Sequence, residues 1–129
     1  MRPGPEIPAG LSPLSVALAR STSYREEEVR GALREALAPL GGPGAFFRPG
    51  ETILLKPNLL AAFPPEAAAT THPSLVRAMV EMVRDAGAVP LIGDTPGGSW
   101  GRPARMEETY EKTGMAEVSR QTGCPLLYE

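Results

Sequence analysis

The sequence predicts an α/β domain built on a parallel sheet of about four strands, with helices on the faces of the sheet. Short apolar runs alternate along the chain with segments whose apolar residues recur at helical spacing. Such an alternation of strands and helices is typical of a parallel sheet with crossover helices. The expected order begins and ends with a strand, so nothing would cover the last one. We therefore expect an incomplete doubly wound domain, the N-terminal part of a larger fold or a chain that needs a partner.

The composition fits one ordinary globular domain and excludes several classes of function. The chain has 129 residues, 42% of them hydrophobic, which suits a single domain with a modest core. Its net charge of −2 offers no basic surface for a phosphate backbone, so we expect no nucleic-acid partner. No apolar run approaches the roughly 18 residues of a membrane span, and no secretory signal is evident. We therefore expect a cytoplasmic protein without membrane contact.

The single cysteine, Cys124, and the single histidine, His72, limit the choice of cofactor. One cysteine excludes an internal disulfide and a self-contained iron–sulfur cluster, and one histidine excludes a multi-histidine metal centre. A lone cysteine is more often a small core residue than a nucleophile, so we assign Cys124 to the core. The cofactor stays unknown, and we predict no metal site.

The first part of the chain predicts an arm, a strand and a helix. Residues 1–13 are rich in proline and glycine and predict a flexible arm, which leaves 14–129 as the folded domain. The apolar run at 15–19 predicts a first strand. The pattern S-x-x-E at 23–26 is a capping box that opens a helix. Its apolar face repeats at helical spacing until Gly41 ends it.

The centre of the chain predicts a buried strand, a long loop and a second helix. The apolar run at 52–55 predicts the strand, and Pro57 ends it because proline cannot donate to a sheet ladder. The connection at 59–72 is longer than most loops between a strand and a helix, and such loops are often functional. Pro73 suits the first turn of the next helix, and Gly87 its end.

The last part predicts two more strands and two short helices. Residues 89–92 read as a strand, with Pro90 placing it at a sheet edge or at a strand start. The glycine-rich loop 93–99 follows. Helical spacing predicts helices at 104–112 and 115–121, and 125–128 reads as a fourth strand.

Lys56 and Asn58 are the first candidate site residues. They follow the central strand directly, and ligands of open α/β sheets bind at the carboxyl ends of the strands. Lysine is costly to bury unpaired, so its place after three apolar residues points to an anionic partner, with Asn58 hydrogen-bonding beside it. The alternative is that Lys56 ends the strand and Asn58 fixes the loop through an Asx turn.

Thr70, Thr71 and His72 form a second candidate cluster, just before a helix. Unpaired backbone N–H groups and the helix dipole favour an anion there, and the hydroxyls would add donors. His72 could act as an acid or base near neutral pH, although the sequence shows no partner to orient it. The alternative is ordinary N-capping by Thr71 or Ser74.

Asp94, Thr95, Gly97 and Gly98 form the third cluster. Glycines allow the backbone to approach a ligand, and successive N–H groups can bind an anion. Asp94 could instead bind a ligand hydroxyl or a hard cation. The loop matches neither the dinucleotide nor the P-loop pattern. The alternative is a flexible turn with Asp94 as a cap.

Three motifs together resemble the family known as domain of unknown function 362. These are LKPNL at 55–59, TTHP at 70–73, and the run from AGA at 86–88 to GDTPGG at 93–98. The resemblance covers roughly Val16 to Glu129. It implies the α/β fold and the place of the site. Members of that family are usually at least twice this long, and many carry ferredoxin-type motifs for four-iron–four-sulfur clusters. This chain has no such motif.

Three functions are compatible with the sequence, and whether the protein is an enzyme stays open. The first is binding of a small anionic or phosphate-bearing ligand at the carboxyl ends of the strands. The second, implied by the resemblance alone, is a redox-associated module whose iron–sulfur partner lies on another chain or in a missing C-terminal half. The third is a non-catalytic fragment.

Overall fold

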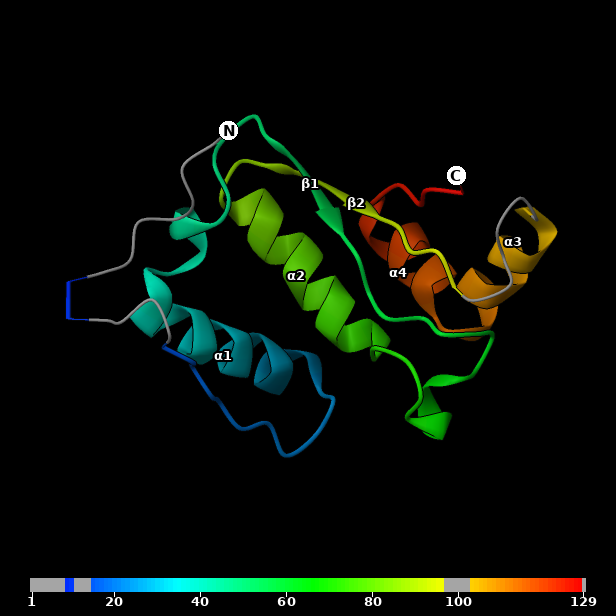
Figure 1. Cartoon of the computed structure of the whole chain (residues 1–129), viewed down its shortest axis with the longest axis horizontal. Coiled ribbons are helices and arrows are strands. Elements are labelled where there is room, and N and C mark those ends of the chain that lie inside the picture. Colours follow the sequence, from blue (N-terminus) through cyan, green and yellow to red (C-terminus); the bar gives the residue numbers. More distant parts are fainter. Residues whose placement is uncertain (1–8, 11–14, 97–102, 129) are drawn as a thin grey trace.

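The structure is a computed structural model that describes residues 9–10, 15–96 and 103–128. The expected arm at 1–13 falls almost wholly outside the described residues, and so do Gly97 and Gly98. The described chain is a mixed α/β fold with four α-helices and a two-stranded sheet (Figure 1). Its helices and strands are α1 (Glu26–Leu37), β1 (Thr52–Leu55), α2 (Pro73–Asp85), β2 (Val89–Ile92), α3 (Pro103–Lys112) and α4 (Met115–Thr122).

The two strands pair in parallel, as the alternation of strand and helix predicts. The register runs from Thr52 opposite Val89 to Leu55 opposite Ile92. The helix α2 connects them and packs on both. The predictions of β1, α2 and β2 are therefore confirmed, and those of α3 and α4 are confirmed to within a residue at either end.

The predicted fourth strand, residues 125–128, is reduced to one bridge. Leu126 pairs in parallel with Ile92, held by hydrogen bonds from Ile92 N–H to Pro125 O (2.9 Å) and from Leu127 N–H to Ile92 O (2.8 Å). The strands are parallel, so the next bond of the ladder toward residue 128 would run from the Asp94 N–H to the Leu127 carbonyl. Asp94 lies beyond the end of β2 at Ile92, and the Leu127 carbonyl accepts the Tyr110 hydroxyl instead.

The predicted first strand, residues 15–19, is wrong. This segment has no regular structure, and Val16 and Leu18 are 90% and 93% exposed. Figure 1 shows it running beside α1, away from β1 and β2. A short apolar run becomes a strand only where it joins a sheet, and the described sheet consists of β1 and β2.

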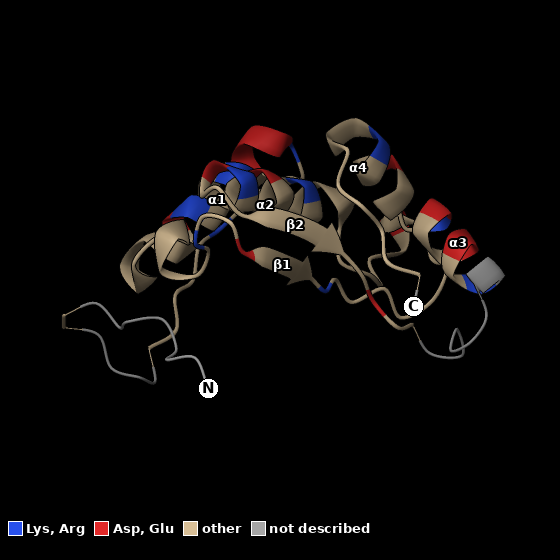
Figure 2. Ribbon diagram, turned by 90° about the horizontal axis from the view of Figure 1, so that it is seen from above, with Lys and Arg blue, Asp and Glu red and all other residues tan. Residues whose placement is uncertain are grey.

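Helices pack against one face of the sheet, although the sequence predicts helices on both. On the covered face Ile53, Leu55 and Ile92 contact the core under α2 and α4. Figure 2 shows α1, α2 and α4 on the same side of the strands. On the other face Leu54 and Val89 stay about half exposed, with no described element over them. Parallel sheets are normally covered on both faces, so this one-sided sheet is unusual.

The helix α1 begins later than its capping box predicts. Its N-cap is Arg25, and Ser23 instead donates from its hydroxyl to the Glu28 carboxylate (2.9 Å). At the other end the chain tightens into a 3-10 turn over residues 38–40, and Gly41, with φ of 100°, ends it as predicted. The helix, described in full, buries only Val29.

Candidate functional site

Lys56 and Asp94, which lie 38 residues apart in sequence, meet at the carboxyl ends of β1 and β2. The Lys56 Nζ is 2.5 Å from the Asp94 Oδ1, and the other carboxylate oxygen accepts the backbone N–H of Leu59 at 3.0 Å. The Asp94 side chain is 4% exposed, whereas that of Lys56 is 63% exposed. The buried Asp94 carboxylate therefore joins the segment after β2 to the segment after β1, and Lys56 faces solvent.

Burial and hydrogen bonding act on the pKa of Asp94 in opposite directions. Burial alone would raise it, but hydrogen bonds from Lys56 and from the backbone of Leu59 and Thr95 outweigh burial and lower the pKa. The carboxylate is therefore ionised near neutral pH. Its charge stabilises the loop after β1 and holds the Lys56 ammonium in place.

Asn58 and Thr71 join the first and second candidate clusters. The Asn58 N–H donates to the Thr71 hydroxyl, and the Thr71 N–H donates to the Asn58 carbonyl, both at 3.0 Å. These bonds use the backbone of Asn58, so its exposed side chain is available to a ligand. Beside them the Thr70 hydroxyl oxygen is buried without a hydrogen-bond partner within the described structure. Such groups are rare in folded proteins and usually meet a water or a ligand.

His72 is itself the N-cap of α2, where the sequence offered Thr71 or Ser74 for that role. Its Nδ1 accepts the backbone N–H of Ser74 at 3.2 Å, and its ring stacks on Tyr24 with centroids 3.7 Å apart. Burial lowers the pKa of His72, although nearby Glu66 acts to raise it. The imidazole is therefore neutral near pH 7.

The first turn of α2 differs from the open anion site that the sequence predicts. Pro73 has no N–H, Ser74 donates to the His72 ring, and Leu75 donates to the His72 carbonyl. The backbone donors there are thus already used. Lys56, the Asn58 side chain and the threonine hydroxyls can still attract a ligand at this end of the sheet.

The structure describes only part of the glycine-rich loop. Thr95 is exposed, and Gly97 and Gly98 lie outside the described residues. Gly93 is closely packed, because an added Cβ would lie 3.1 Å from a methyl group of Leu54 and 3.2 Å from the Cβ of Leu127. Its backbone therefore serves the sheet, with its N–H bonded to the Leu55 carbonyl.

A cavity that the sequence does not predict lies beside these residues. It has a volume of about 590 Å³ and lies between residues 19–24, α1 and the first turn of α2. Thr70, Thr71 and His72 form one wall, and Val29 and Leu33 of α1 form another. No local pattern signals it, because its walls come from segments about 40 residues apart.

The described residues contain no group of three or more potential metal ligands. Cys124 is fully buried, its thiol lies 3.3 Å from the Pro90 carbonyl, and burial raises its pKa. Its assignment to the core is therefore confirmed. Within the described part of the chain, no helix has the length and hydropathy to span a membrane.

Comparison with known proteins identifies the family. The family described as Domain of unknown function (DUF362) matches residues 53–129, more than half of the chain. This chain belongs to the DUF362 family. The DUF362 match contains Lys56, Thr71 and Asp94, whereas α1 precedes it.

A curated relative also matches the chain. The chain is 45% identical over 82 residues to thylakoid-associated protein sll1697 of Synechocystis sp. (strain ATCC 27184 / PCC 6803 / Kazusa). Those residues are 64% of this chain and 26% of the cyanobacterial protein, so the chain spans about a quarter of the length of this relative. No solved structure matches.

Proposed function

We propose that this DUF362 domain binds a small anionic ligand, a phosphate ester or a carboxylate, at the carboxyl ends of β1 and β2. The observation that carries the proposal is the exposed Lys56 ammonium, held 2.5 Å from the buried Asp94 carboxylate. An ammonium has three N–H donors, so its bond to Asp94 leaves others for a bound anion. The Thr71 hydroxyl belongs to a residue that lines the same hollow as Lys56, and the exposed Asn58 side chain follows two residues along the chain.

The ion pair with Asp94 weakens this attraction without abolishing it. The buried carboxylate lies behind the exposed ammonium, so a ligand anion approaching from solvent is nearer to the positive charge than to the negative one. Its role is positioning: it fixes a long, flexible side chain that would otherwise lose rotamer entropy on binding.

Titration of inorganic phosphate and of hexyl phosphate, followed by calorimetry, tests the proposal. Lys56→Gln removes the charge but keeps a donor for Asp94, and we expect it to weaken the binding of both anions at least ten-fold. Lys112→Gln is the matched control, because Lys112 is the other lysine of the chain and is similarly exposed, on α3. Equal binding by the wild type and by Lys56→Gln would exclude Lys56 from the site.

The alternative of a redox-associated module stays a prediction that rests on the family. The cyanobacterial relative is described as thylakoid-associated, and its greater length supports the idea that this domain works beside a further polypeptide. Co-expression with a ferredoxin-type protein, followed by size-exclusion chromatography and electron paramagnetic resonance, tests this. Separate elution of the two proteins would count against it.

A further inference from the structure

We propose that the anion bound at Lys56 carries an apolar body, and that this body lies in the cavity between α1 and the first turn of α2. The inference rests on the function proposed above and names the ligand class. That class is an amphipathic anion, with one phosphate or carboxylate attached to an apolar chain or ring. Two adjoining hollows and the chemistry of their walls carry the inference.

The two hollows adjoin at Thr71 and Leu75. The smaller one has a volume of about 160 Å³, and its walls include Lys56, Leu55 and Met79. The larger one is the cavity of about 590 Å³ described above. Thr71 and Leu75 line both, so the hollows are neighbours, and the proposed ligand, held at Lys56, would pass these two residues to reach the larger cavity.

The walls of the larger cavity suit an uncharged body. None of its lining residues, all of which are described, is a lysine, arginine, aspartate or glutamate. Burial keeps His72 neutral, because it lowers the pKa of the ring. Val29, Ala32 and Leu33 of α1 face Leu75 of α2 across it. The positive charge is thus confined to the Lys56 end, and the volume is typical of a small-molecule site.

The Thr70 hydroxyl gives the cavity a way to select its ligand. The hydroxyls of Thr22 and Ser23 donate to Glu28, so they are already used. The Thr70 hydroxyl is buried in the wall without a partner among the described residues. Rotation about its χ1 would offer that hydroxyl to a polar atom on the ligand body, which would remove the cost of an unpaired polar group.

Three probes separate the anion from the body: inorganic phosphate, hexyl phosphate and 1-hexanol. Each buried CH₂ is worth roughly a four-fold gain in affinity. We therefore expect hexyl phosphate to bind at least ten-fold more tightly than phosphate, and 1-hexanol to bind weakly. Calorimetry on the full chain measures all three.

Two variants fill the cavity from opposite walls. Ala32→Met lengthens a side chain on α1, and Ser21→Met does so from the facing segment, outside any helix or strand. We expect each to remove the advantage of hexyl phosphate while leaving the binding of phosphate unchanged. Ala38→Met, an exposed position beyond the end of α1, is the control and should retain that advantage.

The outcomes of the two proposals differ. If hexyl phosphate and phosphate bind the wild type equally and Lys56→Gln weakens both, the amphipathic ligand is wrong and the anion site stands. If Lys56→Gln changes neither affinity, the anion site itself is wrong. If Ala38→Met lowers hexyl phosphate affinity as much as the two filling variants do, the cavity is not where the body lies.

Discussion

The helix α1 and the pair of C-terminal helices, α3 and α4, are attached to the central helix α2 by different forces. The C-terminal helices bury Met106, Tyr110, Met115 and Val118 in one cluster with residues of α2 and β2. In contrast α1, described in full, buries only Val29. The C-terminal attachment is therefore a hydrophobic core, and the N-terminal one is not.

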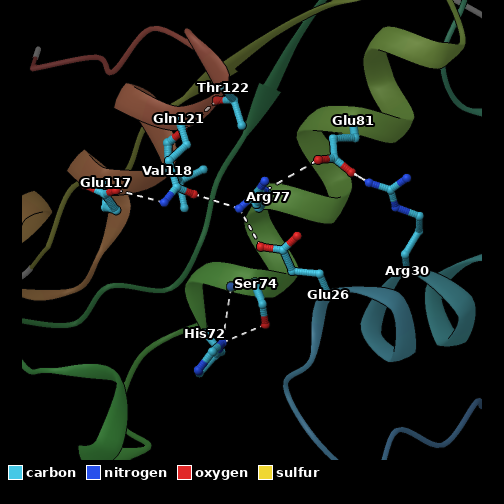
Figure 3. A network of polar contacts seen from close by, with 10 residues as sticks. All are labelled: Glu26, Arg30, His72, Ser74, Arg77, Glu81, Glu117, Val118, Gln121 and Thr122. Atoms are coloured by element: carbon cyan, nitrogen blue, oxygen red, sulfur yellow. Dashed lines mark hydrogen bonds and ion pairs between the residues drawn. The ribbon is translucent and has the colours of Figure 1, made fainter.

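Charged side chains supply what α1 lacks in apolar contact. Figure 3 shows Arg77 of α2 between Glu26 of α1 and Glu81 of its own helix, while Arg30 of α1 pairs with Glu81. Arg77 also donates to Gln121 of α4 at 2.7 Å, so it joins three helices. These charged side chains are partly exposed, between 26% and 55%, and ion pairs at the surface contribute about 0–1 kcal/mol each, much less than a packed core. We infer that α1 opens more readily than the rest, which suits a helix that forms one wall of a ligand cavity.

The largest expected effect comes from the C-terminal core. Tyr110 is fully buried, and its hydroxyl donates to the Leu127 carbonyl. Tyr110→Ala should lower the free energy of unfolding by about 3–5 kcal/mol, because it leaves a cavity and an unpaired carbonyl. Urea denaturation measures this. Tyr128→Ala, the edge-on neighbour at the surface, should cost much less, and equal losses would show that this region is not a close-packed core.

Removing the Asp94 charge should have the next largest effect. Asp94→Asn should cost about 1.5–3 kcal/mol, the range for hydrogen bonds to charged groups. The pKa of Asp94 is lowered in the folded state, so its contribution is fully present above the unfolded pKa of about 3.9 and is lost as the pH falls through the folded value. Urea denaturation between pH 7 and pH 2 measures both. The exposed Asp85→Asn is the control, and a loss of stability in acid that is unchanged by Asp94→Asn would contradict the assignment.

The effect of Val29→Ala should be smaller and confined to α1. The change removes about two methylene equivalents of buried surface, or roughly 1.6 kcal/mol. We expect faster amide hydrogen exchange within α1, with little change in α4, because α1 opens without unfolding the core. Val16→Ala, at an exposed position, should change neither. Equal acceleration in α1 and α4 would show that the two regions unfold as one unit.

The smallest effect should come from the ion pairs. Glu81→Gln removes the carboxylate that both Arg30 and Arg77 contact, and should destabilise α1 by less than about 1 kcal/mol. Raising the salt concentration should mimic the variant, because salt screens exposed pairs. Hydrogen exchange of α1 measures both. Glu35→Gln, on the exposed side of α1, is the control, and salt-independent exchange would leave the charged attachment without support.

The sequence predicted which polar residues follow the strands, and it predicted part of their arrangement in space. Parallel strands bring their carboxyl ends to one edge, so the sequence indicated that Lys56 and Asp94 would lie near each other. It gave no sign that Asp94 would be buried beneath Lys56, because burial depends on the loop after β1 folding back through Leu59. The role of His72 as a cap was likewise hidden, since several residue types can end a helix.

What the sequence alone determined is local: the bounds of β1, α2 and β2, the positions of α3 and α4, and the polar residues that follow each strand. The spacing of apolar residues and the positions of glycine and proline carry this information, because both reflect the backbone geometry of residues that are neighbours in sequence. The tertiary structure decided which apolar runs found partners. Residues 15–19 form no strand, the run at 125–128 keeps one bridge because β2 ends at Ile92, and no described element covers the second face of the sheet. Pairing and burial are set by segments distant in sequence, and local pattern does not record which of them meet.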